Sequence, residues 1–149
     1  ICRTKNQEKE SMGSIQKEWL VYFFEPAPHR YTKLTKLLWK HKPGFAHVGA
    51  LSYESKHDLW QHIQYTHAGI CTDIITPEEA RELLSRLYGY KILICPQKED
   101  YQFLRLKEIT CVTFMMRLIG FYRAWVFTPY QLYCALRKAG YKSFWSKTS

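Results

Sequence analysis

The sequence predicts an α+β fold with a central antiparallel sheet packed against helices. Two observations carry this prediction. Short runs rich in aromatic and apolar residues follow one another closely between residues 17 and 75, which is typical of strands linked by tight turns. Two Thr-Pro pairs, Thr76-Pro77 and Thr128-Pro129, each open a segment with the composition of a helix. The resulting order of strands and helices is typical of the α+β class.

The first strand is expected at Lys17–Phe24, which is rich in aromatic residues and is followed by two prolines. Pro43-Gly44 marks a turn before a second strand, and Ala68-Gly69 marks a turn after a third. These segments form an antiparallel meander that continues into residues 70–75. The remaining expected strands are 45–53, 59–65 and 90–96.

Four helices are expected. The helix after Thr76 has Pro at its first position, Glu79 completing a capping box, and Gly89 as its stop after about Tyr88. The segment 31–41 places leucines near helical spacing with lysines on the other face. The two remaining helices are expected to run from Cys111 to Gly120 and from Pro129 to Gly140.

Composition places the chain among single-domain globular proteins. Its 149 residues are 46% apolar and 16% aromatic, enough to build a core, and no apolar run reaches the ~20 residues that span a bilayer. Residues 1–11 are polar and lack the apolar core of a secretion signal. We therefore expect a disordered or non-native tail over 1–11, a single domain over 12–149, and a cytoplasmic location.

Charge and cysteine usage narrow the expected partners. The net charge of +9 favours anionic partners in general, but no nucleic-acid-binding motif accompanies it, so nucleic acid is not the expected partner. The five cysteines are odd in number and lack CxxC spacing, which favours free thiols in a reducing compartment. Histidines and cysteines are scattered, so neither a metal nor another cofactor is expected.

The chemistry-bearing residues are Cys111 and His47. Cys111 opens an apolar helix, where the helix dipole favours a thiolate. His47 lies within the otherwise apolar, strand-like run Phe45–Leu51. Burying a titratable side chain there is unfavourable unless the side chain has a partner or a function. If the strand faces the start of the helix, His47 can take the thiol proton. The pair predicts a cysteine nucleophile with a histidine base.

A third polar residue is expected to hold the imidazole in its useful tautomer. Alternation along the strand 59–65 puts Trp60, His62 and Gln64 on one face. Gln64 is the expected orienting residue if its strand lies beside His47, and His62 is its rival on the same face. A glutamine fixes the tautomer but does not stabilise an imidazolium as a carboxylate does.

Three segments together resemble the circularly permuted NlpC-type papain-like hydrolases, which include lecithin:retinol acyltransferase-like enzymes and small phage and bacterial proteins. They are Ala46-His47-Val48-Gly49, the strand from Trp60 to Gln64, and Thr110-Cys111-Val112-Thr113-Phe114. Phe127-Thr128-Pro129-Tyr130-Gln131-Leu132-Tyr133 is similar to the Thr-Pro helix of phage-borne members.

The resemblance covers roughly residues 17–140 and implies a papain-like fold with the nucleophile at a helix N-terminus. It implies a thiol peptidase or amidase without metal, acting on a peptide or peptidoglycan-like amide. Cys111 would be the nucleophile, His47 the base and Gln64 the orienting group. Phage virion proteins are then possible partners, and a phage particle is then a possible location. The alternative is a non-catalytic phage structural or assembly protein that uses the same fold.

Packing explanations compete with each of these assignments. Cys111 alone is explained equally by core packing, His47 by a structural hydrogen bond, and Gln64 by an exposed strand position. Cys71, Cys95 and Cys134 are expected to be core or partly buried thiols. A dense group of aromatic residues is expected to pack between helices or to line a substrate groove: Phe121, Tyr122, Trp125, Phe127, Tyr130 and Tyr133.

Overall fold

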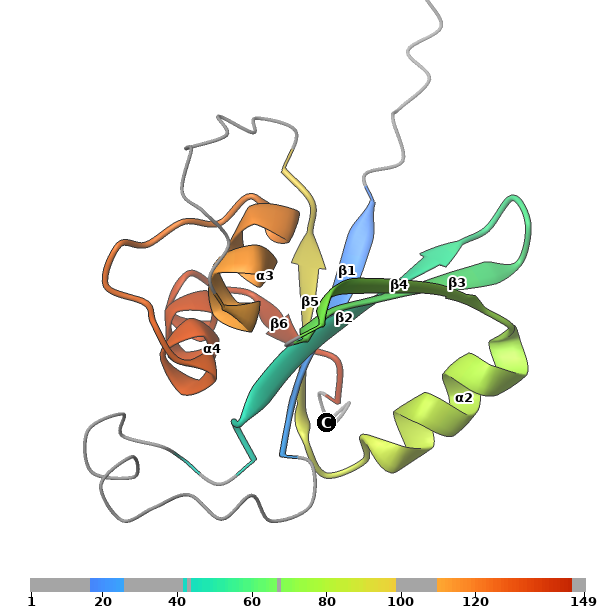
Figure 1. Ribbon diagram of the computed structural model, residues 1–149, viewed down its shortest axis with the longest axis horizontal. Coiled ribbons are helices and arrows are strands. Elements are labelled where there is room, and N and C mark those ends of the chain that lie inside the picture. The colour runs from blue at the N-terminus through green and yellow to red at the C-terminus, as the bar shows by residue number, and fades with distance from the viewer. Residues whose placement is uncertain (1–16, 26–41, 43, 67, 99–109, 146–149) are drawn as a thin grey trace, which may run out of the picture.

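The protein is α+β, with a six-stranded antiparallel sheet and three helices among the residues that the computed structural model describes (Figure 1). Those residues are 17–25, 42, 44–66, 68–98 and 110–145. The helix expected over 31–41 and the tail expected over 1–11 lie outside them. The elements are β1 (Glu18–Phe24), β2 (His47–Glu54), β3 (Leu59–Thr66), β4 (Gly69–Ile75), α2 (Pro77–Arg86), β5 (Lys91–Pro96), α3 (Cys111–Ile119), α4 (Pro129–Lys138) and β6 (Lys142–Ser143).

The sheet has the strand order β4-β3-β2-β1-β5-β6. Strands β1 to β4 form the expected antiparallel meander, and β5 pairs with the free side of β1. The edge strand β6 was not predicted. It consists of two residues paired with Leu93 and Ile94, too few for an alternating pattern to be visible in the sequence.

Helices α3 and α4 cover one face of the sheet, and α2 covers the other (Figure 1). Val21, Ala50 and Ile63 are cross-strand neighbours on the first face, where they pack with both helices. Helix α3 follows a helical spacing of apolar residues, and the side chains at its buried positions are at most 6% exposed. These positions are Val112, Phe114, Met115, Met116 and Ile119.

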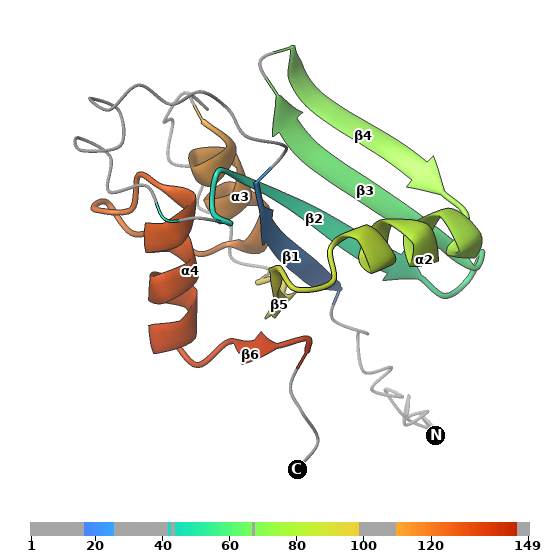
Figure 2. The same cartoon turned by 90° about the horizontal axis from the view of Figure 1, so that it is seen from below.

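Helix α2 packs at one end of its face. Its leucines join a core cluster with Trp60 at the start of β3 and Ile75 at the end of β4. Because β2 and β3 are antiparallel, the start of β2 lies beside the end of β3, at the opposite end of this face. Figure 2 shows α2 near one end of the meander and α3 near the other. His47 and Gln64 therefore lie away from α2.

Candidate active site

Cys111 is the first residue of α3, as the sequence predicts. Thr110 is the N-cap, and its hydroxyl accepts a hydrogen bond from the Thr113 amide at 3.2 Å. The Thr113 hydroxyl in turn accepts from the Thr110 amide at 3.1 Å, and the Phe114 amide donates to the Thr110 carbonyl. The cap thus uses the amides of Thr113 and Phe114 but leaves those of Cys111 and Val112 for the thiol.

Three backbone amides lie close enough to the Cys111 sulfur to favour its thiolate. Two belong to Cys111 and Val112 at the start of the helix, and the third belongs to Val48 on β2. Burial raises the pKa of the Cys111 thiol, while the three amides act to lower it because they favour the thiolate. Burial has the largest effect, so the pKa lies above its ordinary value, contrary to what the helix start alone predicts.

The contact with Val48 lies where β2 and β3 separate. Pairing between these strands ends at Gly49 and Gln64, although β2 begins at His47 and β3 continues to Thr66. The Val48 amide in this stretch donates to the thiol. That amide belongs to the peptide bond that joins His47 to Val48, so the thiol lies beside the backbone of the candidate base, while the His47 ring is on the opposite face of the sheet.

His47 and Gln64 are joined by a side-chain hydrogen bond. Gln64 lies opposite Gly49 on the adjacent strand, which places it diagonally from His47 on the same face of the sheet. Burial lowers the pKa of His47, the Gln64 hydrogen bond raises it, and the charge of His62 lowers it further. The Phe24 ring lies against the imidazole edge-to-face, with 5.4 Å between ring centroids. His47 is therefore held mainly as a neutral imidazole.

His62 has a different partner. Its Nε2 lies 2.7 Å from the hydroxyl of Tyr22, and Asp73 lies opposite it on β4. Burial lowers the pKa of His62, and Asp73 raises it. Of the two residues that the sequence left open as partners of His47, Gln64 makes the hydrogen bond, whereas His62 influences His47 only through its charge.

Tyr22 and Gly49 complete this face and were not predicted. Tyr22 lies opposite Gly49, and its hydroxyl and ring occupy the space that a side chain at position 49 would need. A glycine inside a strand often marks such a close approach, which is the signal that the sequence offered. The register that selects Tyr22 was not available from the sequence.

The other predicted residues divide between core and surface. Phe121 is buried, while Tyr130 and Tyr133 pack against Phe45, two residues before His47. Three more of the aromatic group are exposed: Tyr122, Trp125 and Phe127. Among the cysteines, Cys95 is buried and Cys71 is partly buried. Cys134 is exposed, contrary to expectation, because the buried positions of α4 are Leu132, Ala135 and Leu136.

Comparison with known proteins finds no matching family model, no matching curated protein and no matching solved structure. Among the described residues, no group of three histidine, cysteine or acidic side chains has the arrangement of a metal site. None of the described helices is both long and apolar enough to cross a membrane.

Proposed function

We propose that the protein is a papain-like cysteine hydrolase of the permuted NlpC type that cleaves an amide bond in a peptide or peptidoglycan-like substrate. Cys111 is the nucleophile, His47 the general base and Gln64 the orienting residue. One observation carries the proposal: the thiol binds the peptide group between His47 and Val48, while Gln64 holds the His47 ring. The order histidine, polar residue, cysteine along the chain is the one that the family resemblance implies, and glutamine at the polar position departs from the His, Glu or Asp that is common in the family.

The resting pair is a neutral thiol and a neutral imidazole. Burial raises the pKa of Cys111 and lowers that of His47, so neither group carries a charge near neutral pH. A neutral imidazole is the form that accepts a proton. Proton transfer therefore accompanies attack by the sulfur and does not precede it.

In the first step His47 takes the proton from the thiol as the sulfur attacks the carbonyl carbon of the amide. The carbonyl electron pair moves onto oxygen, where the amides of Cys111 and Val112 stabilise the negative charge. His47 then gives its proton to the amine as the C–N bond breaks, and a thioester remains on Cys111. Water, activated by His47, hydrolyses the thioester and releases a carboxylic acid and the free thiol.

A second candidate function is a non-catalytic structural or assembly protein, and the direction of the His47 side chain favours it. His47 lies on the face of Phe24 and Gln64, whereas α3 packs on the face of Val48. In the hydrolase, the thiol must then meet the imidazole past Gly49 and Gln64, where the pairing of β2 with β3 ends. If it does not, Cys111 is a packing residue and His47 is a hydrogen-bonded strand histidine.

The rate at which iodoacetamide alkylates Cys111, followed by mass spectrometry of its peptide across pH, separates these functions. In the hydrolase, we expect the rate to rise as His47 loses its proton and to be substantial at about pH 7, because neutral His47 removes the thiol proton. In His47→Gln, alkylation should require a pH above the ordinary thiol pKa. His57→Gln, which changes an exposed histidine in the β2–β3 turn, is the matched control and should follow the wild type.

Cys111 alkylation that begins only above about pH 9 in the wild type, with the same profile in His47→Gln, would overturn the hydrolase proposal. It would leave the non-catalytic function. Circular dichroism of His47→Gln establishes that a changed profile does not come from unfolding.

A further inference from the structure

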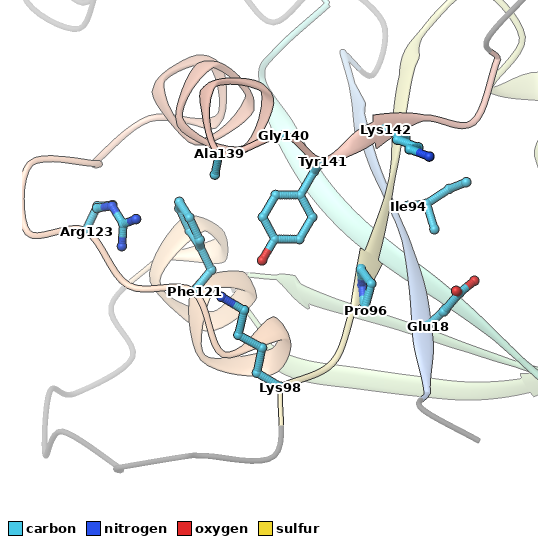
Figure 3. A pocket seen from close by; sticks show the side chains of 10 residues that line it. All are labelled: Glu18, Ile94, Pro96, Lys98, Phe121, Arg123, Ala139, Gly140, Tyr141 and Lys142. Carbon is cyan, nitrogen blue, oxygen red and sulfur yellow. The ribbon is translucent and has the colours of Figure 1, made fainter. Parts of the chain in front are cut away.

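A second concave site lies at the far end of α3 from Cys111, around the edge of the sheet formed by β5 and β6. Its volume is about 820 Å³, which falls within the range of small-molecule sites. It lies beyond the carboxyl ends of α3 and α4, and Figure 3 shows the Tyr141 ring at its centre. The lining residues are Glu18, Ile94, Pro96, Lys98, Phe121, Arg123, Ala139, Gly140, Tyr141 and Lys142.

Part of the pocket wall is aromatic, and it holds one unsatisfied polar atom. The rings of Phe121 and Tyr141 meet edge-to-face with 5.8 Å between centroids, while the Ile94 side chain lies across β5 from them. The Tyr141 hydroxyl is buried, and no described residue hydrogen-bonds it. A buried hydroxyl without a partner is costly, so a ligand atom that hydrogen-bonds it would gain from doing so.

The pocket has an excess of positive charge. Lys98, Arg123 and Lys142 line it, against the single carboxylate of Glu18. Within the described part of the chain, no ion pair neutralises any of these three cations. The pocket therefore favours a ligand that carries negative charge.

One of these cations, Arg123, is held by contacts of its guanidinium, and the backbone and Cβ of Lys98 pack beside Gly120. The Arg123 guanidinium lies 4.5 Å from the Phe121 ring centroid and donates to the Tyr122 carbonyl at 2.8 Å. The stem of Lys98 passes so close to Gly120 that an added Cβ there would lie 3.1 Å from the Lys98 Cβ. The Arg123 charge is thus placed beside the Phe121 ring before any ligand arrives, which lowers the ordering cost of binding.

We propose that this pocket binds a small organic anion with a carboxylate or phosphate head and an apolar body of one or two rings. Lys98 and Arg123 bind the head group, the Tyr141 hydroxyl hydrogen-bonds it, and the Phe121 and Tyr141 rings contact the body. The proposal is independent of the hydrolase activity, because none of these residues belongs to the Cys111 site.

Titration calorimetry on the full chain with four probes tests the proposal. We expect 1-naphthoate or 1-naphthyl phosphate to bind, and the tighter of the two identifies the head group. The neutral 1-naphthamide should bind at least tenfold more weakly, as should inorganic phosphate, because one lacks the charge and the other the apolar body. A Kd above about 1 mM for both naphthyl anions, or equal binding of naphthamide or inorganic phosphate, would overturn the proposal.

Two variants locate the binding. Lys98→Ala should weaken binding of the preferred anion about tenfold. Lys138→Ala removes an equal charge from the last turn of α4, outside the pocket lining, and should leave affinity unchanged. Equal losses in the two variants would mean that net charge alone attracts the anion and would refute a built site.

Tyr141→Phe separates binding from folding. Removing an unsatisfied buried hydroxyl should leave the protein as stable as the wild type or more stable in urea, since no hydrogen bond is lost. The same change should weaken binding of the anion, because the head group loses a donor. Unchanged affinity in Tyr141→Phe would remove the tyrosine from the site and contradict the proposal.

Discussion

At Cys111, two physical effects oppose each other. Desolvation favours the neutral thiol, and three converging amides favour the thiolate. The helix dipole is felt at the surface of the first turn, but here the thiol is pressed against β2, so burial has the larger effect. A cysteine at a helix N-terminus is thus activated only when the surrounding chain leaves it hydrated or supplies a base.

Gln64→Glu should strengthen the candidate base. A carboxylate in place of the carboxamide would raise the pKa of His47 because it stabilises the imidazolium. We expect the alkylation profile of Cys111 to move to higher pH and its plateau rate to rise severalfold. Gln61→Glu introduces the same charge on the opposite face of β3 and should have no such effect. An unchanged profile in Gln64→Glu would show that Gln64 does not act on the reactive pair.

Gly49→Ala should destabilise the protein by about 1–3 kcal/mol, because the new methyl group overlaps the Tyr22 hydroxyl and ring. Urea unfolding measures the loss. In a Tyr22→Leu background the same glycine change should cost much less, because the ring that it meets is gone. A full cost in that background would mean that the penalty comes from the strand backbone and not from Tyr22.

The site residues divide by how local their signals are. The place of Cys111 at a helix start could be predicted because an apolar helical segment follows it, and the face of Gln64 because strand alternation gives it. The partner of His62 could not, because the Tyr22–His62 contact spans two strand pairings and depends on the register of both. The net effect of burial on Cys111 also depends on packing that no local pattern contains.

At the scale of elements, each of the three helices begins at a threonine that forms a capping box. For α2 and α4 the Thr-Pro pair made this start visible in the sequence, whereas strand limits moved by one or two residues. The second strand begins at His47 and not at Phe45, because the Phe45 amide donates to the Lys42 carbonyl in a turn before the strand. Caps are local hydrogen bonds, but strand ends are decided by their neighbours.

Thr110→Ala and Thr76→Ala test whether one cap has a second role. Each should lower the free energy of unfolding by about 0.5–2 kcal/mol, since each removes the acceptor of an N3 amide. Only Thr110→Ala should also slow Cys111 alkylation, because its cap fixes the turn whose amides contact the sulfur. Equal alkylation rates in the two variants, measured where both are folded, would show that the Thr110 cap does not affect the reactivity of the Cys111 thiol.

At the scale of the whole molecule, the sheet separates two kinds of interior. The face under α3 and α4 is an apolar core, whereas the other face combines the α2 cluster with His47, His62, Gln64 and the Tyr22 hydroxyl. The sequence predicted the class and the meander because hairpins connect neighbouring strands. It did not give the place of β5 beside β1, since that pairing joins segments about 70 residues apart.

Buried histidines lie on one face of the sheet and buried cysteines on the other. The free energy of unfolding should therefore be greatest between about pH 6.5 and 9 and should decrease at lower and at higher pH. Burial lowers the pKa of His47 and His62, so below about pH 6.5 the unfolded chain binds protons that the folded chain does not, and stability falls as pH falls. Burial raises the pKa of Cys111, and that of Cys95 from 9.0 to about 12. Above pH 9.0 the unfolded thiols lose protons that the folded ones keep, so stability falls as pH rises.

Urea unfolding at a series of pH values measures the acidic and the alkaline decrease in stability, which we call the acidic and the alkaline limb. Two variants show which residue causes each limb. Each group changes the free energy of unfolding by up to about 1.4 kcal/mol per pH unit within its window. Cys95→Ala should be less stable at pH 7.5, because it leaves a cavity, yet its stability should fall less steeply above pH 9.0. His62→Gln should flatten the limb between about pH 6.5 and 5, above the range where most carboxylates titrate. If stability falls as steeply above pH 9.0 in Cys95→Ala as in the wild type, the Cys95 thiol does not cause the alkaline limb. Burial would then not be shown to raise the pKa of a thiol in this core, and the same argument for Cys111 would be weakened.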